Sequence, residues 1–361
     1  MYRIGTILGG THGAEEAIDT ALQVVHTLDI PMERQEFDLG ADRYRRTGEL
    51  LTPQDVAQLR TMDALLCGSP LGGSNPGIPP GVLERGLLFG LRRELELGVN
   101  LRVFRALGNR TNADVAVVRE NSEGLYSGEG TVLHPGSDAE FTAEVSVATY
   151  HATQRCARYA FDLAHHRRRL VTLAHKRAVL TASGALWDRV VQTLATQYPE
   201  VTLVVENVDA LCARLVTDPE RYDVIVTDTL FGDIVADVAG AATGSLDRSG
   251  SAELTTASTG PSLFEPVHTP LGTGQPVNPL GVLTAVAMML DNLGQRAASS
   301  ALGQATLIAA ASRPRRARLA DTVTADAREL LALSRDRDAL PHAGNGRHDH
   351  AQRIVPAPRD S

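Results

Sequence analysis

Acidic side chains in this sequence lie just beyond short apolar runs. Asp233 and Asp237 follow the run at residues 222–227, and their four-residue spacing would place them on one face of a helix. Asp209 follows another apolar run, at residues 201–208. Carboxylate oxygens are the ligands that hard divalent cations such as Mg²⁺ and Mn²⁺ prefer. The spacing therefore indicates a metal site, although Asp233 could instead cap a helix and Asp237 could be a solvated surface residue.

The chain contains a single lysine. Of its 35 Lys and Arg residues, only Lys176 is lysine. Arginine stays protonated in any protein site, whereas the compact lysine amine can lose a proton when it is buried. A lone lysine at the end of the apolar run at residues 170–176 therefore indicates amine chemistry. Chance retention of one lysine on a surface loop is the alternative.

Three arginines and one tyrosine complete the set of candidate functional residues. Arg92 and Arg102 are ten residues apart, and Arg119 is followed closely by Tyr126. Arginine binds carboxylates through paired hydrogen bonds. Any one of these arginines could be structural, but together with the aspartates and Lys176 they fit a site for a dicarboxylate bound to a metal ion.

The elements that must position these residues alternate between strands and helices. Strand-like runs occur at residues 4–8, 34–39, 64–68, 114–119, 170–176, 201–208 and 222–227. Helical periodicity occurs at residues 14–28, 53–62, 82–97, 152–165, 185–197, 233–242, 281–293 and 317–333. The alternation predicts an α/β protein, in which functional groups gather at the carboxyl ends of strands. Residues 141–149 alternate in polarity and predict an antiparallel arm.

Composition excludes several classes of protein. The chain has 361 residues, of which 43% are hydrophobic and 22% charged, which is enough apolar material for a real core. No apolar run approaches the ~18–20 residues of a membrane span, and a net charge of −8 argues against nucleic-acid binding. The first residues do not resemble a signal peptide, and three scattered cysteines fit a reducing cytoplasm. Residues 335–361 lack periodicity and are expected to form a disordered tail.

Five segments together resemble the isocitrate/isopropylmalate dehydrogenase family of metal-dependent β-decarboxylating enzymes. They are residues 46–51, 82–88, 119–126, 223–237 and 264–268, within a resemblance that extends from about residue 4 to residue 292. Residues 82–88 and the loop before them are most similar to actinobacterial isopropylmalate dehydrogenases.

The resemblance implies the isopropylmalate dehydrogenase-like α/β fold, in which two α/β domains share a sheet and the cofactor site is not of the Rossmann type. One domain would combine residues 1–98 with residues 244–334. The other, residues 99–243, would carry the arm and the dimer interface.

The resemblance also implies a role for each candidate residue on the substrate side. Tyr126 and Lys176 would serve acid/base steps. Arg92, Arg102 and Arg119 would hold the malate carboxylates, and Asp209, Asp233 and Asp237 would bind Mg²⁺ or Mn²⁺, with Asp209 also at the substrate. Glu84, Leu87 and Leu88 would contact the substituent of the malate, and the two apolar leucines favour an alkyl group. Lys176 and Asp209 would come from the neighbouring subunit of a homodimer.

The cofactor side departs from the family pattern. Glu265, His268 and Asn278 are the residues expected to hold NAD, with NADP left open. The unusual positions are residues 9–16, Ala178, Thr229 and residues 269–273. One hypothesis is a working dehydrogenase that oxidatively decarboxylates a 3-isopropylmalate-like substrate, with isocitrate, homoisocitrate or tartrate as alternatives. The other is a paralogue that decarboxylates a β-keto acid, or a non-catalytic subunit that binds dicarboxylate and metal.

Overall fold

A ten-stranded sheet forms the centre of the molecule. The computed structural model describes residues 1–9, 13–68, 75, 77–107, 111–267, 276–312 and 318–339. The strand order is β2-β1-β3-β12-β11-β4-β5-β10-β8-β9. The strands are β1 (Tyr2–Gly9), β2 (Met32–Gly40), β3 (Ala64–Cys67), β4 (Val99–Arg105), β5 (Asp114–Glu120), β8 (Leu170–Ala174), β9 (Thr202–Glu206), β10 (Val224–Thr227), β11 (Gly250–Leu254) and β12 (Ser262–Pro266).

The sheet is parallel towards both edges and antiparallel in the middle. β12 pairs in parallel with β3, and β5 pairs in parallel with β10. The pairs β12–β11, β11–β4 and β4–β5 are antiparallel. The β11–β4 pair joins a strand from each of the two expected domains. The expectation of an α/β protein built on one shared sheet is thus confirmed.

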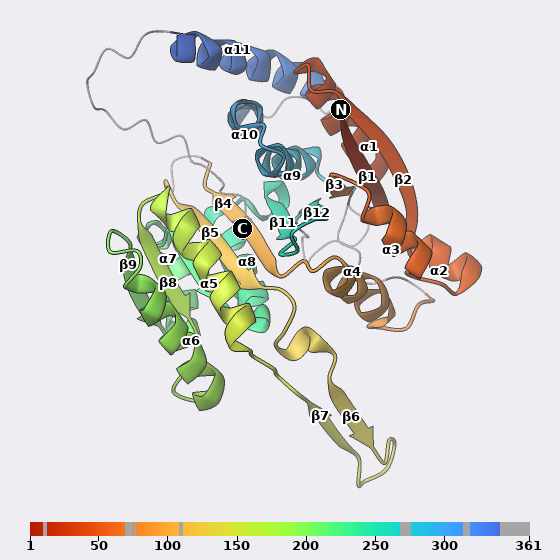
Figure 1. The fold of residues 1–361 in the computed structure, drawn as a ribbon, viewed down its shortest axis with the longest axis vertical. Helices are drawn as coiled ribbons and strands as arrows, with labels where there is room; N and C mark the ends of the chain where they lie inside the picture. The colour runs from red at the N-terminus through yellow and green to blue at the C-terminus, as the bar shows by residue number, and fades with distance from the viewer. Residues whose placement is uncertain are drawn as a thin grey trace.

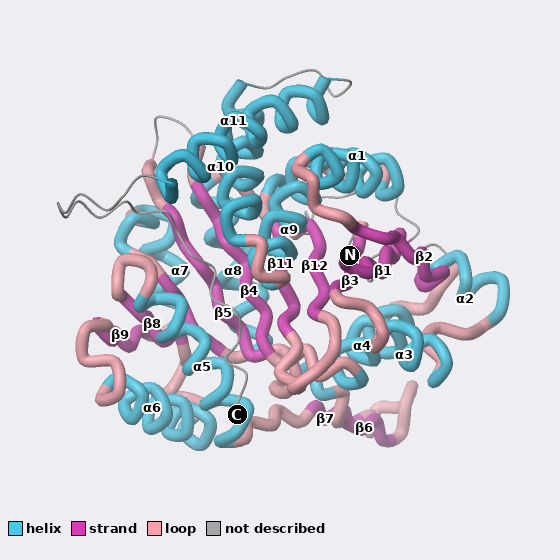
Figure 2. The backbone as a smooth tube through the Cα atoms, turned by 45° about the horizontal axis from the view of Figure 1, so that its top comes forward, coloured by secondary structure: helices cyan, strands magenta, loops and turns pink. Residues whose placement is uncertain are grey.

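Helices cover both faces of this sheet (Figures 1 and 2). They are α1 (Ala14–Thr27), α2 (Ala41–Thr47), α3 (Pro53–Leu59), α4 (Phe89–Glu94), α5 (Tyr150–His165), α6 (Thr181–Ala195), α7 (Val208–Thr217), α8 (Thr229–Thr243), α9 (Pro279–Asn292), α10 (Arg296–Ser312) and α11 (Leu319–Ala339). The largest hydrophobic cluster contains side chains of α1, α5, α6, α9, α10 and α11. Two smaller clusters lie on the opposite face, one with α7 and α8 and one with α3 and α4. Among the described helices, none is both long and apolar enough to span a membrane.

The face with two small clusters also carries the charged residues of the central strands. Successive side chains of a strand point to opposite faces. Leu101 and Val118 belong to the largest cluster, so their neighbours Arg102 and Arg119 point to the other face. The same alternation applies to β11 and β12, and the central strands therefore present a polar seam between the α7–α8 cluster and the α3–α4 cluster.

A two-stranded arm projects from the body of the molecule (Figure 1). β6 (Gly130–Leu133) pairs antiparallel with β7 (Phe141–Glu144). The antiparallel arm expected from the alternation of residues 141–149 is therefore present.

Several expected boundaries require correction. The strand expected at residues 201–208 ends at Glu206, and α7 begins at Val208, so Asp209 lies in the first turn of a helix. The strand expected at residues 170–176 ends at Ala174, and α8 begins at Thr229 rather than Asp233. The tail was expected to begin at residue 335, but helix α11 continues to Ala339. Residues 340–361 of the expected tail lie outside the described residues.

Candidate active site

Asp233 is the centre of a cluster formed by three segments of the chain. It lies on α8, where its Oδ1 atom accepts hydrogen bonds from Nη1 of Arg119 at 2.8 Å and Nη1 of Arg102 at 3.4 Å. The hydroxyl of Tyr126 donates to Oδ2 at 3.2 Å. Burial opposes ionisation of Asp233, but the charges of Arg119 and Arg102 outweigh it and lower the pKa of the carboxyl group. Asp233 is therefore an ionised carboxylate in this cluster.

Arg119 lies at the buried end of the cluster. Its side chain is 2% exposed, and its second partner is Oδ1 of Asn121 at 3.0 Å. Burial, followed by the charges of Arg102 and Arg92, lowers the pKa of Arg119 to about 10. Three guanidinium groups thus lie close together, and the charges of Asp233 and Glu253 offset part of their mutual repulsion.

Tyr126 faces this region with a protonated phenol. Its ring stacks on that of Phe89, with centroids 5.6 Å apart. Burial and the charge of Asp233 raise the pKa of Tyr126. The hydroxyl group therefore keeps its proton at neutral pH and is placed to donate it.

The start of α8 is fixed by its own sequence. Asp228 caps the helix by accepting the N–H of Phe231 at 2.9 Å, a typical N-cap contact. The hydroxyl of Thr229 bonds to the carbonyl oxygens of Glu120 and Glu123 at 2.9 and 2.8 Å. Thr229 therefore ties α8 to the loop after β5. Asp228, not Asp233, is the capping residue, so the capping alternative for Asp233 is excluded.

Gly232 lets α8 approach Arg119. A Cβ atom at this position would lie 2.5 Å from Cγ of Arg119. The absence of a side chain therefore allows the helix that carries Asp233 to pack directly on the arginine.

Arg92 has a different partner from the other two arginines. It lies on α4, and its guanidinium pairs with the carboxylate of Glu253 on β11. Both side chains are buried, and the charge of Glu253 outweighs the effect of burial and raises the pKa of Arg92. Arg92 therefore lies near the cluster, but its guanidinium group is paired with Glu253 of the protein itself.

Glu265 is a second buried carboxyl group on the same face of the sheet. It lies on β12, and its Oε2 atom has no hydrogen-bond partner among the described residues. Burial, followed by the charge of Glu253, raises the pKa of Glu265 to about 7. Burial and the neighbouring carboxylate therefore favour the protonated form of Glu265.

Lys176 and Asp209 form a separate ion pair. Nζ of Lys176 donates to Oδ1 of Asp209 at 2.6 Å, and the charged hydrogen bond lowers the pKa of Asp209. Within the described part of the chain, no three His, Cys, Asp or Glu side chains lie close enough together to hold a metal ion. A single chain therefore does not assemble the three expected aspartates.

The donor chemistry of α8 nevertheless fits a hard cation. Asp233 and Asp237 lie one turn apart on this helix, and both side chains are partly accessible. Two carboxylates on one helix face are suitable oxygen ligands for Mg²⁺ or Mn²⁺, and further ligands would have to come from a substrate, water or another chain.

The expected substituent contacts lie in a five-residue π-helical segment, Glu84–Leu88, directly before α4. Such segments occur often at functional sites. Glu84 and Leu88 are partly exposed, whereas Leu87 is fully buried in the α3–α4 cluster. Leu87 is therefore a core residue in this arrangement and supports the segment from behind.

Of the expected cofactor residues, Glu265 lies on β12 and Asn278 lies at the start of α9. Asn278 caps α9 by accepting the N–H of Leu280 at 3.0 Å, and it donates to Asp247 at 3.1 Å. His268 lies outside the described residues.

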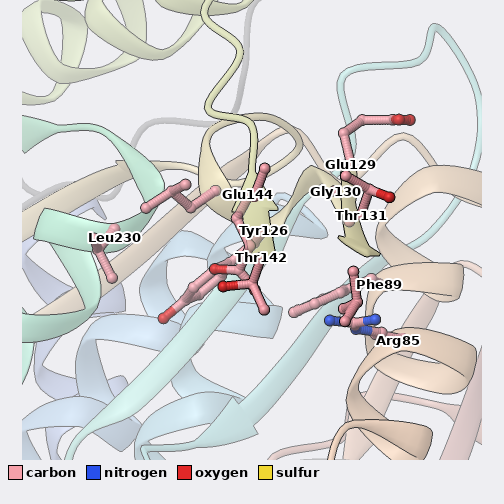
Figure 3. A pocket seen from close by; sticks show the side chains of 13 residues that line it. Arg85, Phe89, Tyr126, Glu129, Gly130, Thr131, Thr142, Glu144 and Leu230 are labelled. Carbon is pink, nitrogen blue, oxygen red and sulfur yellow. The ribbon is translucent and has the colours of Figure 1, made fainter. Parts of the chain in front are cut away.

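A pocket of about 790 Å³ lies between the π-helical segment, the Tyr126 loop, the arm and the start of α8 (Figure 3). Phe89, Tyr126 and Leu230 line its inner part, and Arg85 and Glu144 contribute charged groups. It is large enough for a small organic acid.

Sequence reasoning missed the acidic partner of Arg92, the buried His175 beside Lys176, and Asp228. Glu253 lies on a short strand between Ala252 and Leu254, and the alternation of polar and apolar residues was its only signal. His175 is buried with neither ring nitrogen hydrogen-bonded among the described residues, and burial lowers its pKa to about 4. Burial raises the pKa of the nearby Asp228 to about 6.

Comparisons with known proteins find matches over most of the chain. The isocitrate/isopropylmalate dehydrogenase family matches residues 3–330. A 3-isopropylmalate dehydrogenase of Corynebacterium efficiens is 43% identical over 330 residues, which cover 89% of this chain and 96% of that protein. One from Rhodococcus opacus is 42% identical and covers 81% of this chain and 89% of its own length.

Solved structures show the same architecture. An isocitrate dehydrogenase from Methylococcus capsulatus superposes with a TM-score of 0.75 at 27% identity, over 91% of this chain and all of that one. A β-decarboxylating dehydrogenase from Thermococcus kodakarensis gives a TM-score of 0.71 at 29% identity, over 93% and 98% of the two chains. The family resemblance expected from the sequence motifs is confirmed.

Proposed function

The chain belongs to the isocitrate/isopropylmalate dehydrogenase family, and from this premise we propose that it oxidatively decarboxylates a 3-alkylmalate such as 3-isopropylmalate with NAD(P)⁺. The main observation behind the proposal is that Arg102, Arg119 and Tyr126 all donate hydrogen bonds to Asp233. This arrangement combines cationic groups for carboxylates, a carboxylate for a metal ion and a phenol that can donate a proton. Relatives named 3-isopropylmalate dehydrogenase support the choice of substrate.

Arg102 and Arg119 would hold the substrate carboxylates. Both guanidiniums share Asp233 as a partner and lie on the polar face of the sheet. Charge-assisted hydrogen bonds from a buried arginine fix a carboxylate in position and orientation. Arg92 lies beside these two arginines, and its charge is balanced by that of Glu253.

Asp233 and Asp237 would hold Mg²⁺ or Mn²⁺, with Asp209 of a second copy as a further ligand. A bound divalent ion acidifies a coordinated hydroxyl group and stabilises enolate charge, and nicotinamide accepts a hydride. The chain itself must hold the carboxylates and move the protons.

Two residues would move protons at different stages. Lys176 is the amine that can accept the proton of the substrate hydroxyl, which an arginine at the same place could not do. Tyr126 keeps its proton at neutral pH and would donate it to the enol that remains after CO₂ leaves.

The substituent of the malate would lie beside the π-helical segment. Leu88 is partly exposed there, and Phe89 and Leu125 line the adjoining pocket. Apolar side chains stabilise an alkyl group by its removal from water. This supports an isopropyl-like substituent, with Glu84 at the edge of the same segment.

The arm supports a homodimer. Val132, Leu133 and Phe141 are each about half exposed on a two-stranded sheet with no further strand among the described residues. Isolated two-stranded sheets are marginally stable, and exposed apolar surface of this kind marks interaction sites. A second copy would cover the arm and supply Lys176 and Asp209.

The test is turnover of 3-isopropylmalate with Mn²⁺ and either NAD⁺ or NADP⁺, followed by absorbance of the reduced nicotinamide. We expect activity with at least one cofactor, and more with an alkylmalate than with isocitrate. No reduction of either cofactor, with substrate binding demonstrated separately, would contradict the dehydrogenase.

A β-keto acid decarboxylase is the second candidate. Asn278 was expected to bind the cofactor. Its side chain instead caps α9 and donates a hydrogen bond to Asp247, and this observation favours the decarboxylase. Release of CO₂ from the 2-keto-3-carboxy acid without added nicotinamide, together with no hydride transfer, would support this activity.

A further inference from the structure

Asn121 is a buried amide that joins Arg119 to the connection between α4 and β4. Its Oδ1 atom accepts a hydrogen bond from Nη2 of Arg119 at 3.0 Å, and its Nδ2 atom donates to the carbonyl oxygen of Leu97 at 2.9 Å. The side chain of Asn121 is 3% exposed. A guanidinium can only donate and a carbonyl can only accept, so a side-chain amide satisfies both partners at once. Loss of this amide would deprive two buried groups of a hydrogen-bond partner.

The backbone around Leu97 links Asn121 to a second arginine. The N–H of Leu97 donates to the carbonyl oxygen of Arg92 at 2.8 Å, and the N–H of Asn121 donates to the carbonyl oxygen of Gly98 at 3.3 Å. Leu97 and Gly98 lie directly before β4, which pairs with β5 and carries Arg102. Asn121 is therefore bonded to the chain between two of the site's arginines and, through its side chain, to the third.

Among the described residues, Asp233 and Asn121 hold the guanidinium of Arg119. Nη1 bonds to Asp233 at 2.8 Å and Nη2 bonds to Asn121, whereas Nε has no hydrogen-bond partner in the described part of the chain. Asp233 is 40% exposed, and under the proposed function its carboxylate also serves the metal ion. Burial, followed by the charges of Arg102 and Arg92, lowers the pKa of Arg119, so these neighbours repel its guanidinium. Asn121 is thus the buried partner that resists this repulsion.

We propose that Asn121 is a positioning residue for substrate binding, which holds the guanidinium of Arg119 in the orientation that receives a substrate carboxylate. The inference rests on the proposed function for the role of Arg119. A guanidinium binds a carboxylate well where its planar set of N–H groups faces the ligand, and misplacement by about 1 Å can cost a factor of about 10². Arg119 would hold the carboxylate both before and during the reaction, so loss of its orientation should weaken binding more than it slows the bound substrate.

The first test measures the binding of succinate, an unreactive dicarboxylate, by isothermal titration in the presence of Mg²⁺. Asn121→Leu keeps the branched shape of the side chain and removes both of its hydrogen bonds. We expect the Kd for succinate to rise about tenfold, the scale of one charge-assisted hydrogen bond. With 3-isopropylmalate as substrate, KM should rise in parallel while kcat falls less than about threefold.

A double-mutant cycle separates positioning from a general effect on the fold. Arg119→Lys keeps the charge and removes the fork of N–H groups, so it should itself raise the Kd for succinate. If Asn121 acts through Arg119, the addition of Asn121→Leu to Arg119→Lys should raise the Kd no further. Two effects that multiply, or an unchanged Kd in Asn121→Leu alone, would overturn the inference. Thr306→Val, which removes a buried hydrogen bond of 2.7 Å on α10, is the control for lost stability and should leave the Kd unchanged.

The same titrations distinguish failure of the inference from failure of the proposed function. An unchanged Kd in Arg119→Lys, or succinate that does not bind the wild type, counts against the proposed substrate site and the inference together. If Asn121→Leu does not fold, a crystal structure of the wild-type chain with succinate and Mg²⁺ decides the matter. We expect Nη2 of Arg119 to stay bonded to Asn121 while a succinate carboxylate binds Nη1. A guanidinium that leaves Asn121 and binds succinate through both nitrogens would refute the inference.

Discussion

Lys176 is the residue whose chemical role can be tested most directly. It is the only lysine of the chain, and its ammonium group lies 2.6 Å from Asp209 with the side chain 35% exposed. Lys176→Arg keeps the charge and removes the ability to give up a proton. We expect kcat to fall roughly 10²–10⁴-fold, the usual contribution of a positioned acid or base, with little change in substrate Kd. Measurements of kcat and Kd beside the wild type test this, and a near-normal kcat would show that Lys176 acts only as a charge.

Tyr126 offers a second test with a small structural change. Tyr126→Phe removes the hydroxyl that donates to Asp233 at 3.2 Å but keeps the ring that stacks on Phe89. We expect kcat to fall by about 10²–10⁴ and the melting temperature to change by only a few degrees, since one hydrogen bond contributes about 1 kcal/mol. Phe89→Leu is the complementary control, because it disturbs the stacking and leaves the phenol. A larger loss of kcat in that control than in Tyr126→Phe would contradict a proton-transfer role.

Residues with a chemical role were easier to predict from the sequence than the contacts that each of them makes. Arg102, Arg119, Tyr126 and Asp233 were expected from residue type and family resemblance, and the structure brings them together. The partner of Arg92 was not predicted, because Glu253 is 161 residues away and its strand is only five residues long. Long-range pairs of this kind depend on strand order, which local pattern does not determine.

At the scale of elements, the buried helix α9 carries an acidic group with a measurable effect on stability. Asp291 is buried, and its Oδ2 atom has no hydrogen-bond partner among the described residues. Burial raises the pKa of Asp291 to about 6. The folded chain therefore binds this proton more tightly than the unfolded chain, so the group's contribution to the free energy of unfolding is present below about pH 4 and is lost as the pH rises through 6.

Asp291→Asn removes this dependence. We expect the free energy of unfolding of the variant, measured by urea denaturation, to rise relative to wild type between pH 4 and pH 7. The exposed Asp138→Asn should show no such trend. A difference between variant and wild type that is constant with pH would mean that burial does not disfavour the ionised Asp291.

Strands with long apolar runs were predictable, whereas β4, β11 and β12 in the middle of the sheet were not. The runs at residues 4–8 and 114–119 match β1 and β5 because consecutive apolar residues are buried on both faces. β11 and β12 were missed because Ser, Glu, Gly and Pro interrupt their apolar pattern. Glu253 and Glu265 point to the face of the candidate site, so these two functional side chains contributed to the weak strand pattern of β11 and β12.

At the scale of the whole molecule, the arm predicts how the protein assembles. Phe141 is 54% exposed on β7, and a second copy would bury it. We expect Phe141→Asp to give a monomer by light scattering and to lose activity, because Lys176 and Asp209 would no longer reach the site of a partner. Ile308→Asp, a similarly exposed residue on α10, is the control that should remain dimeric. A monomeric Phe141→Asp variant with full turnover would refute the split site.

Metal removal tests the site and the fold separately. Asp233 is already held by Arg102, Arg119 and Tyr126, so loss of a cation leaves no uncompensated charge at its carboxylate. Excess chelator should therefore abolish turnover without unfolding the protein, and Mn²⁺ or Mg²⁺ should restore it. Added metal should also raise the melting temperature, since binding to the folded chain alone stabilises it by about 2.7 kcal/mol at a hundredfold excess over Kd.

Asp237→Asn tests the second expected metal ligand of α8. Asp237 lies one helical turn beyond Asp233 on α8, and its side chain is partly accessible. The substitution should raise the Mn²⁺ concentration needed for half-maximal activity at least tenfold, because replacing a carboxylate with an amide weakens binding of a hard cation. The metal-induced rise in melting temperature should shrink in parallel. Full activity of the wild type in excess chelator, or an unchanged metal requirement in Asp237→Asn, would show that these carboxylates do not bind the catalytic ion.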